Sequence, residues 1–234
     1  MAEIAPTLEI LDTLIAFDTT SRNSNLALIE WVEDFLRKRN ISATRVASAD
    51  GAKANLYAVI GPAVPGGVVL SGHTDVVPVD GQAWTSDPWA LTKSGEKFYG
   101  RGVADMKTFS ALALAHVDEA LGAGLKRPLI LALSYDEEVG CLGAPAMIAE
   151  IARAAPRPSA VIVGEPTSMQ VVSGHKGISV FHVAVEGREA HSSATGQGVS
   201  AIMEALKLMN VVEQMGADAA LRADPQSPFE PKAA

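Results

Sequence analysis

The chain has a single cysteine, Cys141, among its 234 residues. One thiol excludes an internal disulfide and a cysteine-based zinc ribbon, and the small-residue loop around it does not indicate a catalytic nucleophile. Long apolar runs are also missing, since a membrane span needs about 18–20 residues. Because the first basic residue is Arg22, the N-terminus does not resemble a secretory signal. We therefore expect a cytoplasmic protein that does not enter a membrane.

Positive charge is scarce as well, with 19 Lys and Arg against 27 Asp and Glu and a net charge of −8. Nucleic-acid binding needs clustered basic side chains. The longest basic run, residues 37–39, falls where a helix should end and there complements the helix dipole. The composition thus predicts no nucleic-acid partner. A hydrophobic content of 48% is typical of a globular chain with a substantial core.

The spacing of apolar residues predicts an α/β fold. Apolar positions recur every three or four residues through the first forty, which indicates helices. Five short Val-, Ile- and Leu-rich segments follow and are predicted as strands: 43–47, 55–61, 67–73, 128–138 and 159–166. Two helical segments alternate with them, at 106–124 and 143–155. Continuously apolar strands that alternate with helices predict a mostly parallel sheet flanked by helices.

The pattern changes after residue 177. Residues 178–187 alternate between apolar and polar and are predicted as a strand, and residues 198–215 form an amphipathic helical pattern. We therefore divide the chain into residues 1–177 and residues 178–234, the second part being the start of a smaller α+β domain with a one-sided sheet. Residues 216–234, rich in Pro and Ala, are predicted to be poorly ordered.

Ligand-type side chains follow three of the predicted strands, and another precedes a helix. These are His73 and Asp75, then Asp136, Glu137 and Glu138, then Glu165, and lastly Asp105. Taken singly, each could cap a helix, shape a turn or belong to a solvated loop. Parallel strands, however, would bring these ends to one edge of the sheet. Converging carboxylates repel one another unless a cation lies between them. An imidazole with carboxylates and no thiolate suits zinc, cobalt or manganese.

Four segments carry a family resemblance: "SGHTDVVPVDGQAWTSDPWALT", "FYGRGVADMK", "LALSYDEEVGCLGA" and "VIVGEPT". In this order they resemble the motifs of the M20 family of two-metal amidohydrolases and peptidases, and the similarity runs from about Leu8 to about Met215. The resemblance implies a zinc-peptidase-like catalytic domain followed by a lid and dimerisation domain. It also implies two divalent metal ions, Zn²⁺ or alternatively Co²⁺.

The resemblance also implies metal ligands at matching positions. His73 and Glu165 would bind one ion, Asp105 would bridge the two, and Glu138 would bind the second. A further histidine, which comes late in longer family members, has no counterpart in matching context here. We therefore expect the chain to be C-terminally truncated. The alternative to an enzyme is an inactive chain that only binds metal or pairs subunits.

Three further residues receive catalytic roles from the resemblance. Glu137 would be the general base, and the Asp75 carboxylate would hydrogen-bond the far nitrogen of His73. His191 would reach the active site of a neighbouring subunit in a homodimer and steady the oxyanion, unless it only makes local hydrogen bonds. Thr108 departs from the family, which usually has glycine there.

The implied activity is hydrolysis of the amide of a small N-acyl amino acid. The expected substrate is N2-acetyl-L-ornithine, giving L-ornithine and acetate in arginine biosynthesis. N-succinyl-diaminopimelate, dipeptides and other N-acyl amino acids are the alternatives. The side chains that would read the far end of the substrate are not identified by these motifs.

Overall fold

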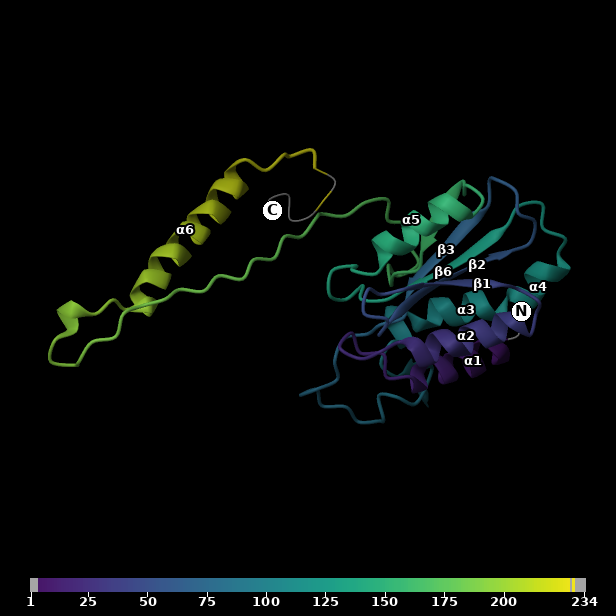
Figure 1. The fold of residues 1–234 in the computed structure, drawn as a ribbon, viewed down its shortest axis with the longest axis horizontal. Coiled ribbons are helices and arrows are strands. Elements are labelled where there is room, and N and C mark those ends of the chain that lie inside the picture. The colour runs from purple at the N-terminus through teal and green to yellow at the C-terminus, as the bar shows by residue number, and fades with distance from the viewer. Residues whose placement is uncertain (1–3, 228, 230–234) are drawn as a thin grey trace. The chain divides into compact units, whose positions relative to one another are not determined.

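A computed structural model describes residues 4–227 and 229 of the chain (Figure 1). It separates into two compact units, with the first reaching Met169 and the second starting at Gln170. The sequence pattern instead predicts a boundary after residue 177. The candidate site lies in the first unit, and each unit is described by itself.

The first unit is built on a five-stranded sheet with the order β1-β2-β6-β3-β7. The strands are β1 (Ala43–Ala47), β2 (Ala54–Ile60), β3 (Val68–His73), β6 (Leu129–Ser134) and β7 (Ala160–Val163). β3 pairs in parallel with both β6 and β7, whereas β2 pairs antiparallel with β1 and β6. Only β2 therefore runs against the others, because a short connection folds it back beside β1. The predicted mostly parallel α/β sheet is confirmed.

Each face of the sheet has its own apolar core. Leu131 and Leu133 of β6 belong to one buried cluster, and Ile130 and Ala132 to the other. This alternation follows from the two-residue period of a strand, which turns successive side chains to opposite faces. Continuously apolar strand sequences are explained in this way, since both faces must be covered.

Helices cover both faces (Figure 1). The larger core is covered by α1 (Ala5–Ala16), α2 (Leu26–Arg37), α3 (Thr108–Ala115) and α4 (Val117–Gly122), and the smaller one by α5 (Ala144–Ala154). α2 ends within the basic run, as the sequence predicted.

Two local features differ from the sequence-based expectation. The helix predicted over 106–124 is confirmed for most of its length but is interrupted, because a π-helical turn (Val103–Lys107) precedes α3 and His116 separates α3 from α4. The His116 Nδ1 atom lies 2.9 Å from the carbonyl oxygen of Leu112, a local bond that competes with a regular helix. A hairpin of β4 (Thr92–Ser94) and β5 (Lys97–Tyr99), which the apolar pattern did not reveal, occupies part of the long connection after β3.

The second unit contains a 3₁₀ turn (Thr195–Gln197) and the long helix α6 (Ala201–Leu221). α6 confirms the predicted helix and extends past residue 215 through an alanine-rich segment of high helix propensity. The strand predicted at 178–187 is not formed, and Ile178, Val180 and Phe181 are more than 80% exposed. An alternating sequence becomes a strand only beside a partner strand, and none pairs with it among the described residues.

Part of the predicted poorly ordered tail, residues 228 and 230–234, lies outside the described residues. In the described part of the chain, no helix is both long enough and apolar enough to cross a membrane.

Candidate metal and active site

The candidate site lies where three parallel strands end. His73 is the last residue of β3 and pairs in register with Ser134, the last residue of β6. The chain after β6 carries Glu137 and Glu138, and the chain after β7 carries Glu165. A backbone bond from Gly164 N to Ser71 O, 3.0 Å long, extends the β3–β7 pairing toward that glutamate. The sheet therefore brings together residues that are far apart in the sequence.

His73 is the centre of this cluster. Its side chain is only 1% exposed, and its Nε2 atom faces carboxylates from three segments. Nε2 lies 3.1 Å from Asp105 Oδ1, 3.8 Å from Glu165 Oε1 and 3.9 Å from Glu137 Oε2. Glu138 completes the group. One imidazole nitrogen thus faces an acidic side chain from each of the other three segments that the sequence singled out.

Among the described residues, two overlapping sets of side chains have the donor atoms to hold a metal ion. One consists of His73, Asp105 and Glu165, and the other of His73, Glu137 and Glu138. Within each set, the candidate ligand atoms lie within 4.8 Å of one another. Nitrogen and carboxylate oxygen donors without thiolate fit zinc or a similar divalent ion.

The pKa values of the cluster reflect its crowded negative charge. Burial raises the pKa of Glu138 and of Glu165, and the nearby charge of Asp105 raises both further, while His73 acts in the opposite direction. Burial lowers the pKa of His73, but the charges and hydrogen bonds of Asp75 and Asp105 outweigh it, so the net shift is upward. These upward shifts follow from the crowding of negative charge, which a bound cation would relieve.

The far nitrogen of His73 has a different partner from the expected one. Nδ1 lies 2.8 Å from the backbone oxygen of Asp75, whereas the Asp75 carboxylate is 3.6 Å away. The backbone carbonyl can only accept, so Nδ1 carries the proton and Nε2 is left free to bind a cation. The bond expected between Nδ1 and the Asp75 carboxylate is thus replaced by one in which Nδ1 donates to the main-chain oxygen of the same residue.

The Asp75 carboxylate instead binds the segment that carries the two glutamates. Oδ1 accepts a hydrogen bond from Glu137 N (3.0 Å) and Oδ2 from Glu138 N (3.2 Å). Oδ2 also accepts from the hydroxyl of Ser21 (2.7 Å). Several donors that point at one buried carboxylate hold its orientation.

Asp105 lies in the turn before α3, and this turn is anchored by Lys107. The Lys107 side chain is almost fully buried, and its Nζ donates to the backbone oxygens of Leu14 (2.9 Å) and Phe17 (2.8 Å). Burial lowers the pKa of this amine to about 7, against the opposing charges of Asp18 and Asp75. The amine thus satisfies carbonyls at the end of α1, where a helix leaves them unpaired.

Thr108 and Phe109 begin α3 directly after this turn. The Thr108 hydroxyl donates to the backbone oxygen of Val103, so it serves the turn itself. The ring of Phe109 lies over two glycines: a Cβ atom at Gly72 would be 3.6 Å from the ring, and one at Gly164 only 2.0 Å from its Cγ atom. These glycines directly precede His73 and Glu165.

Three of the other histidines make local contacts within their own unit. His191, in the second unit, has its Nδ1 atom 2.9 Å from the hydroxyl of Ser193. This is a local bond of the kind considered as its alternative role, and its participation in catalysis stays a prediction. His116 and His175 also contact nearby backbone oxygens.

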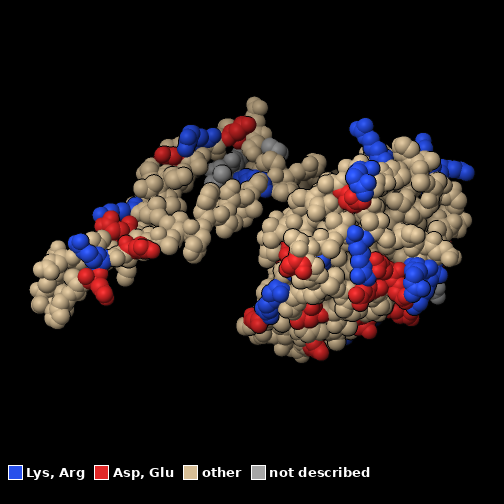
Figure 2. Space-filling view, in the orientation of Figure 1, with Lys and Arg blue, Asp and Glu red and all other residues tan. Residues whose placement is uncertain are grey.

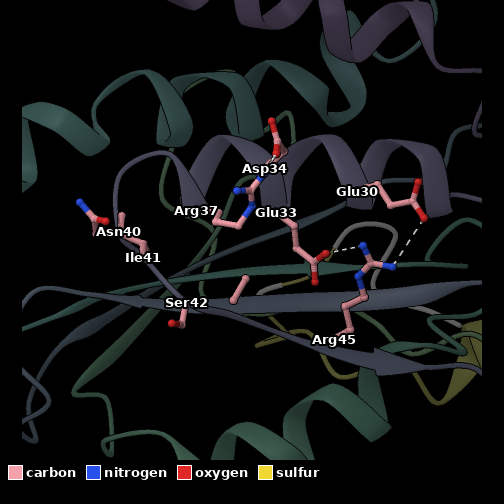
Figure 3. A pocket seen from close by; sticks show the side chains of 9 residues that line it. Glu30, Glu33, Asp34, Arg37, Asn40, Ile41, Ser42 and Arg45 are labelled. Atoms are coloured by element: carbon pink, nitrogen blue, oxygen red, sulfur yellow. Dashed lines mark hydrogen bonds and ion pairs between the residues drawn. The ribbon is translucent and has the colours of Figure 1, made fainter.

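A surface hollow of about 630 Å³ lies elsewhere, between α2 and β1 (Figure 3). Arg45 points between Glu30, at 3.8 Å, and Glu33, and Arg37 pairs with Asp34. The acidic and basic side chains that line this hollow thus form ion pairs with one another. Figure 2 shows the same mixing of acidic and basic side chains over the visible face of the first unit.

Sequence comparison finds relatives of this chain. It is 38% identical to an acetylornithine deacetylase of Shigella sonnei over 208 residues, which is 86% of this chain and 53% of the relative. It is 39% identical to an acetylornithine deacetylase of Myxococcus xanthus, covering 99% of this chain and 60% of the relative. The chain therefore spans about half to three-fifths of the length of these relatives.

Solved structures share the fold. A tripeptidase of Staphylococcus aureus superposes with a TM-score of 0.61 at 17% identity, over 89% of this chain and 56% of the tripeptidase. Human carnosine dipeptidase 1 gives a TM-score of 0.59 at 20% identity, over 67% of this chain and 38% of the dipeptidase. Residues 69–225 match the sequence pattern of peptidase family M20/M25/M40, and they include all five side chains that meet at the end of the sheet. The chain belongs to this peptidase family.

Proposed function

We propose that this chain provides the catalytic centre of a metal-dependent amidohydrolase that removes the acetyl group from N2-acetyl-L-ornithine. The observation that supports this most is the meeting of His73 with four carboxylates at the end of the sheet. Relatives named acetylornithine deacetylase, at 38% and 39% identity, favour this substrate.

His73, Asp105 and Glu165 would hold one divalent ion, and Asp105 and Glu138 would hold a second. Zinc is the preferred ion for this donor set and cobalt the alternative. Such ions supply Lewis acidity, which lowers the pKa of water and polarises an amide carbonyl. The family resemblance implies one more histidine at the second ion, and residues 1–177 would form the catalytic domain around both.

Glu137 is the proposed general base. Its side chain is 35% exposed, so it can meet water and substrate, while its backbone N–H is held by the Asp75 carboxylate. It would take a proton from the attacking water and then deliver it to the nitrogen of the leaving amine. Its Oε2 atom lies 3.9 Å from His73 Nε2, a distance that supports a role beside the proposed ions.

The second unit belongs to the proposal as the start of a lid and dimerisation domain, residues 178–234. In a homodimer, His191 of one subunit would donate a hydrogen bond to the oxyanion in the other. An enzyme of this kind, acting on a small metabolite, would work in the cytoplasm without a nucleic-acid or membrane partner.

Two measurements test the proposed function. The first is the number of Zn²⁺ or Co²⁺ ions bound by the metal-depleted and reloaded protein, because a complete site holds two ions and a single weakly bound ion would favour the truncated alternative. The second compares hydrolysis rates of N-acetylornithine and N-succinyl-diaminopimelate, with a dipeptide as a third substrate. Faster cleavage of the succinyl substrate would overturn the proposed specificity. Metal binding without hydrolysis of any of the three would favour the alternative of a metal-binding or subunit-pairing module.

A further inference from the structure

We infer that Ser21 is a positioning residue, which holds the two active-site glutamates in place through the buried carboxylate of Asp75. Ser21 lies in the polar segment after α1, far in sequence from the family motifs. The inference rests on the proposed function, because it assigns a purpose to the position of Glu137 and Glu138. The contacts that carry it are, however, independent of any substrate.

The segment that carries Ser21 runs beside the end of β3. Thr20 and Val76 form a parallel bridge. Val76 N donates to Thr19 O and Ser21 N donates to Val76 O, each at 3.2 Å. The Thr19 hydroxyl donates to Thr74 O at 2.5 Å. The segment thus continues the sheet for a few residues and fixes Ser21 directly next to Asp75.

From this position Ser21 reaches the glutamates in two steps. Its hydroxyl donates to Asp75 Oδ2 at 2.7 Å, and the same carboxylate accepts from the backbone N–H groups of Glu137 and Glu138. Asp75 is only 2% exposed, so water does not readily replace a lost donor. Removing the hydroxyl would leave part of a buried charge unsatisfied, and the carboxylate would turn or take up a new partner. Either movement releases the backbone of both glutamates.

A second connection joins the same two segments. Lys53 Nζ donates to the backbone oxygen of Ser21 and to Asp136 Oδ1, and both side chains of the Lys53–Asp136 pair are mostly buried. Asp136 directly precedes the glutamates and has a positive φ of 55°. The segment of Ser21 is therefore connected to the turn of residues 136–138 at two points, through Asp75 and through Lys53.

The other side of this turn is held without Ser21. Asn55, which is fully buried, accepts from Tyr135 N and donates to Gly143 O, so it ties the two ends of the loop together. The loop should therefore persist when the hydroxyl of Ser21 is lost. What changes is the position of its tip, which carries the proposed base and a proposed ligand.

Hydrogen–deuterium exchange on the metal-free protein tests this directly. We expect Ser21→Ala to speed exchange about 10-fold in peptides that cover residues 136–142, and Lys53→Met to act on the same peptides. Ser110→Ala is the matched control, because Ser110 is also buried but its hydroxyl has no hydrogen-bond partner among the described residues. Ser21→Thr, which keeps the hydroxyl, should restore slow exchange. Unchanged exchange in Ser21→Ala, or equal changes in Ser110→Ala, would overturn the inference.

Co²⁺ titration, followed by the visible absorption of the bound ion, provides the second readout. Ser21→Ala should lower the affinity for the ion near Glu138 by about 10-fold, within the range known for residues that orient metal ligands. The affinity for the ion held by Glu165 should change less than about two-fold. Equal weakening of both would point to a general loss of structure and overturn the inference. If the wild-type protein bound no Co²⁺, the proposed function would fail, and the exchange experiment would still decide the role of Ser21.

Discussion

Gly164→Ala is the substitution for which the structure makes the sharpest prediction. The new Cβ atom would lie 2.0 Å from Phe109 Cγ and 2.3 Å from both Cδ atoms, far inside ordinary contact distance. These ring atoms are close to the backbone of α3 and cannot swing away as the tip of a long side chain would. The ring and the strand end must therefore separate by more than about 1 Å.

The size of the effect follows from this overlap. Overpacking of this kind costs about 1–3 kcal/mol of unfolding free energy. For a chain of this length, that lowers the melting temperature by roughly 2–4 °C for each kcal/mol. Glu165 follows Gly164 and moves with it, while metal sites tolerate errors of only about 0.2 Å in ligand distance. We therefore expect a loss of at least about 10-fold in affinity for the ion held by His73 and Glu165.

Calorimetry and competition with a chelator measure these two quantities on the same samples. Gly122→Ala is the matched control, because a Cβ there has no atom within 4 Å among the described residues, and it should leave both unchanged. Removing the ring makes room, so Phe109→Ala combined with Gly164→Ala should lose less stability than the sum of the two single changes. Wild-type stability and metal affinity in Gly164→Ala would refute the reasoning.

Three other outcomes are expected. Glu137→Gln should keep at least one metal ion bound, which metal analysis measures, and should lose more than about 100-fold in turnover, which initial rates measure. Near-normal turnover would exclude Glu137 as the general base. The pKa values of His73 and Glu165 are raised in the metal-free fold above their ordinary values of 6.5 and 4.5. Protonation of these side chains therefore stabilises the metal-free fold below those ordinary pKa values, and this stabilisation is lost as the pH rises through the raised ones. Metal ions compete with these protons for the same side chains, so the rise in melting temperature on adding Zn²⁺ should be larger at pH 7 than at pH 5. A rise that is equal or smaller at pH 7 would contradict the cluster as the binding site. Slight burial of the sulfur and the nearby Glu137 raise the pKa of Cys141, although the residue as a whole is exposed. Alkylation by iodoacetamide should therefore be slow at pH 7 and accelerate above pH 9, and fast reaction at pH 7 would contradict this environment.

The sheet and the cluster of acidic side chains around His73 could be predicted from the sequence for one physical reason. Apolar strands such as 67–73 and 128–134 must be covered on both faces, and parallel pairing then sends their final residues to one edge. This predicts that His73, Glu137 and Glu165 meet, and in the structure they do. The apolar pattern does not reveal which of them binds an ion and which moves a proton, and those roles come from the family resemblance.

The supporting contacts could not be predicted in the same way. Ser21 and Lys53 lie in polar segments with no apolar period, and their roles depend on how two loops meet at the end of β3. Lys107 would ordinarily be placed on the surface, because burying an amine is costly, and only the unpaired carbonyls at the end of α1 explain its position. The strand predicted at 178–187 failed for the related reason that a period of two residues cannot reveal whether a neighbouring strand is present.

The outermost strand of the sheet, β7, has a practical consequence for experiments with this chain. Val161, Ile162 and Val163 are each more than half exposed, and no further strand among the described residues pairs with the outer edge of β7. An apolar edge with free backbone groups is a template on which another chain can add a strand. Self-association through this edge would grow with protein concentration and would bury the chain beside Glu165. Activity and metal affinity of this chain should accordingly be compared over a range of protein concentrations, because the proposed homodimer also forms by association.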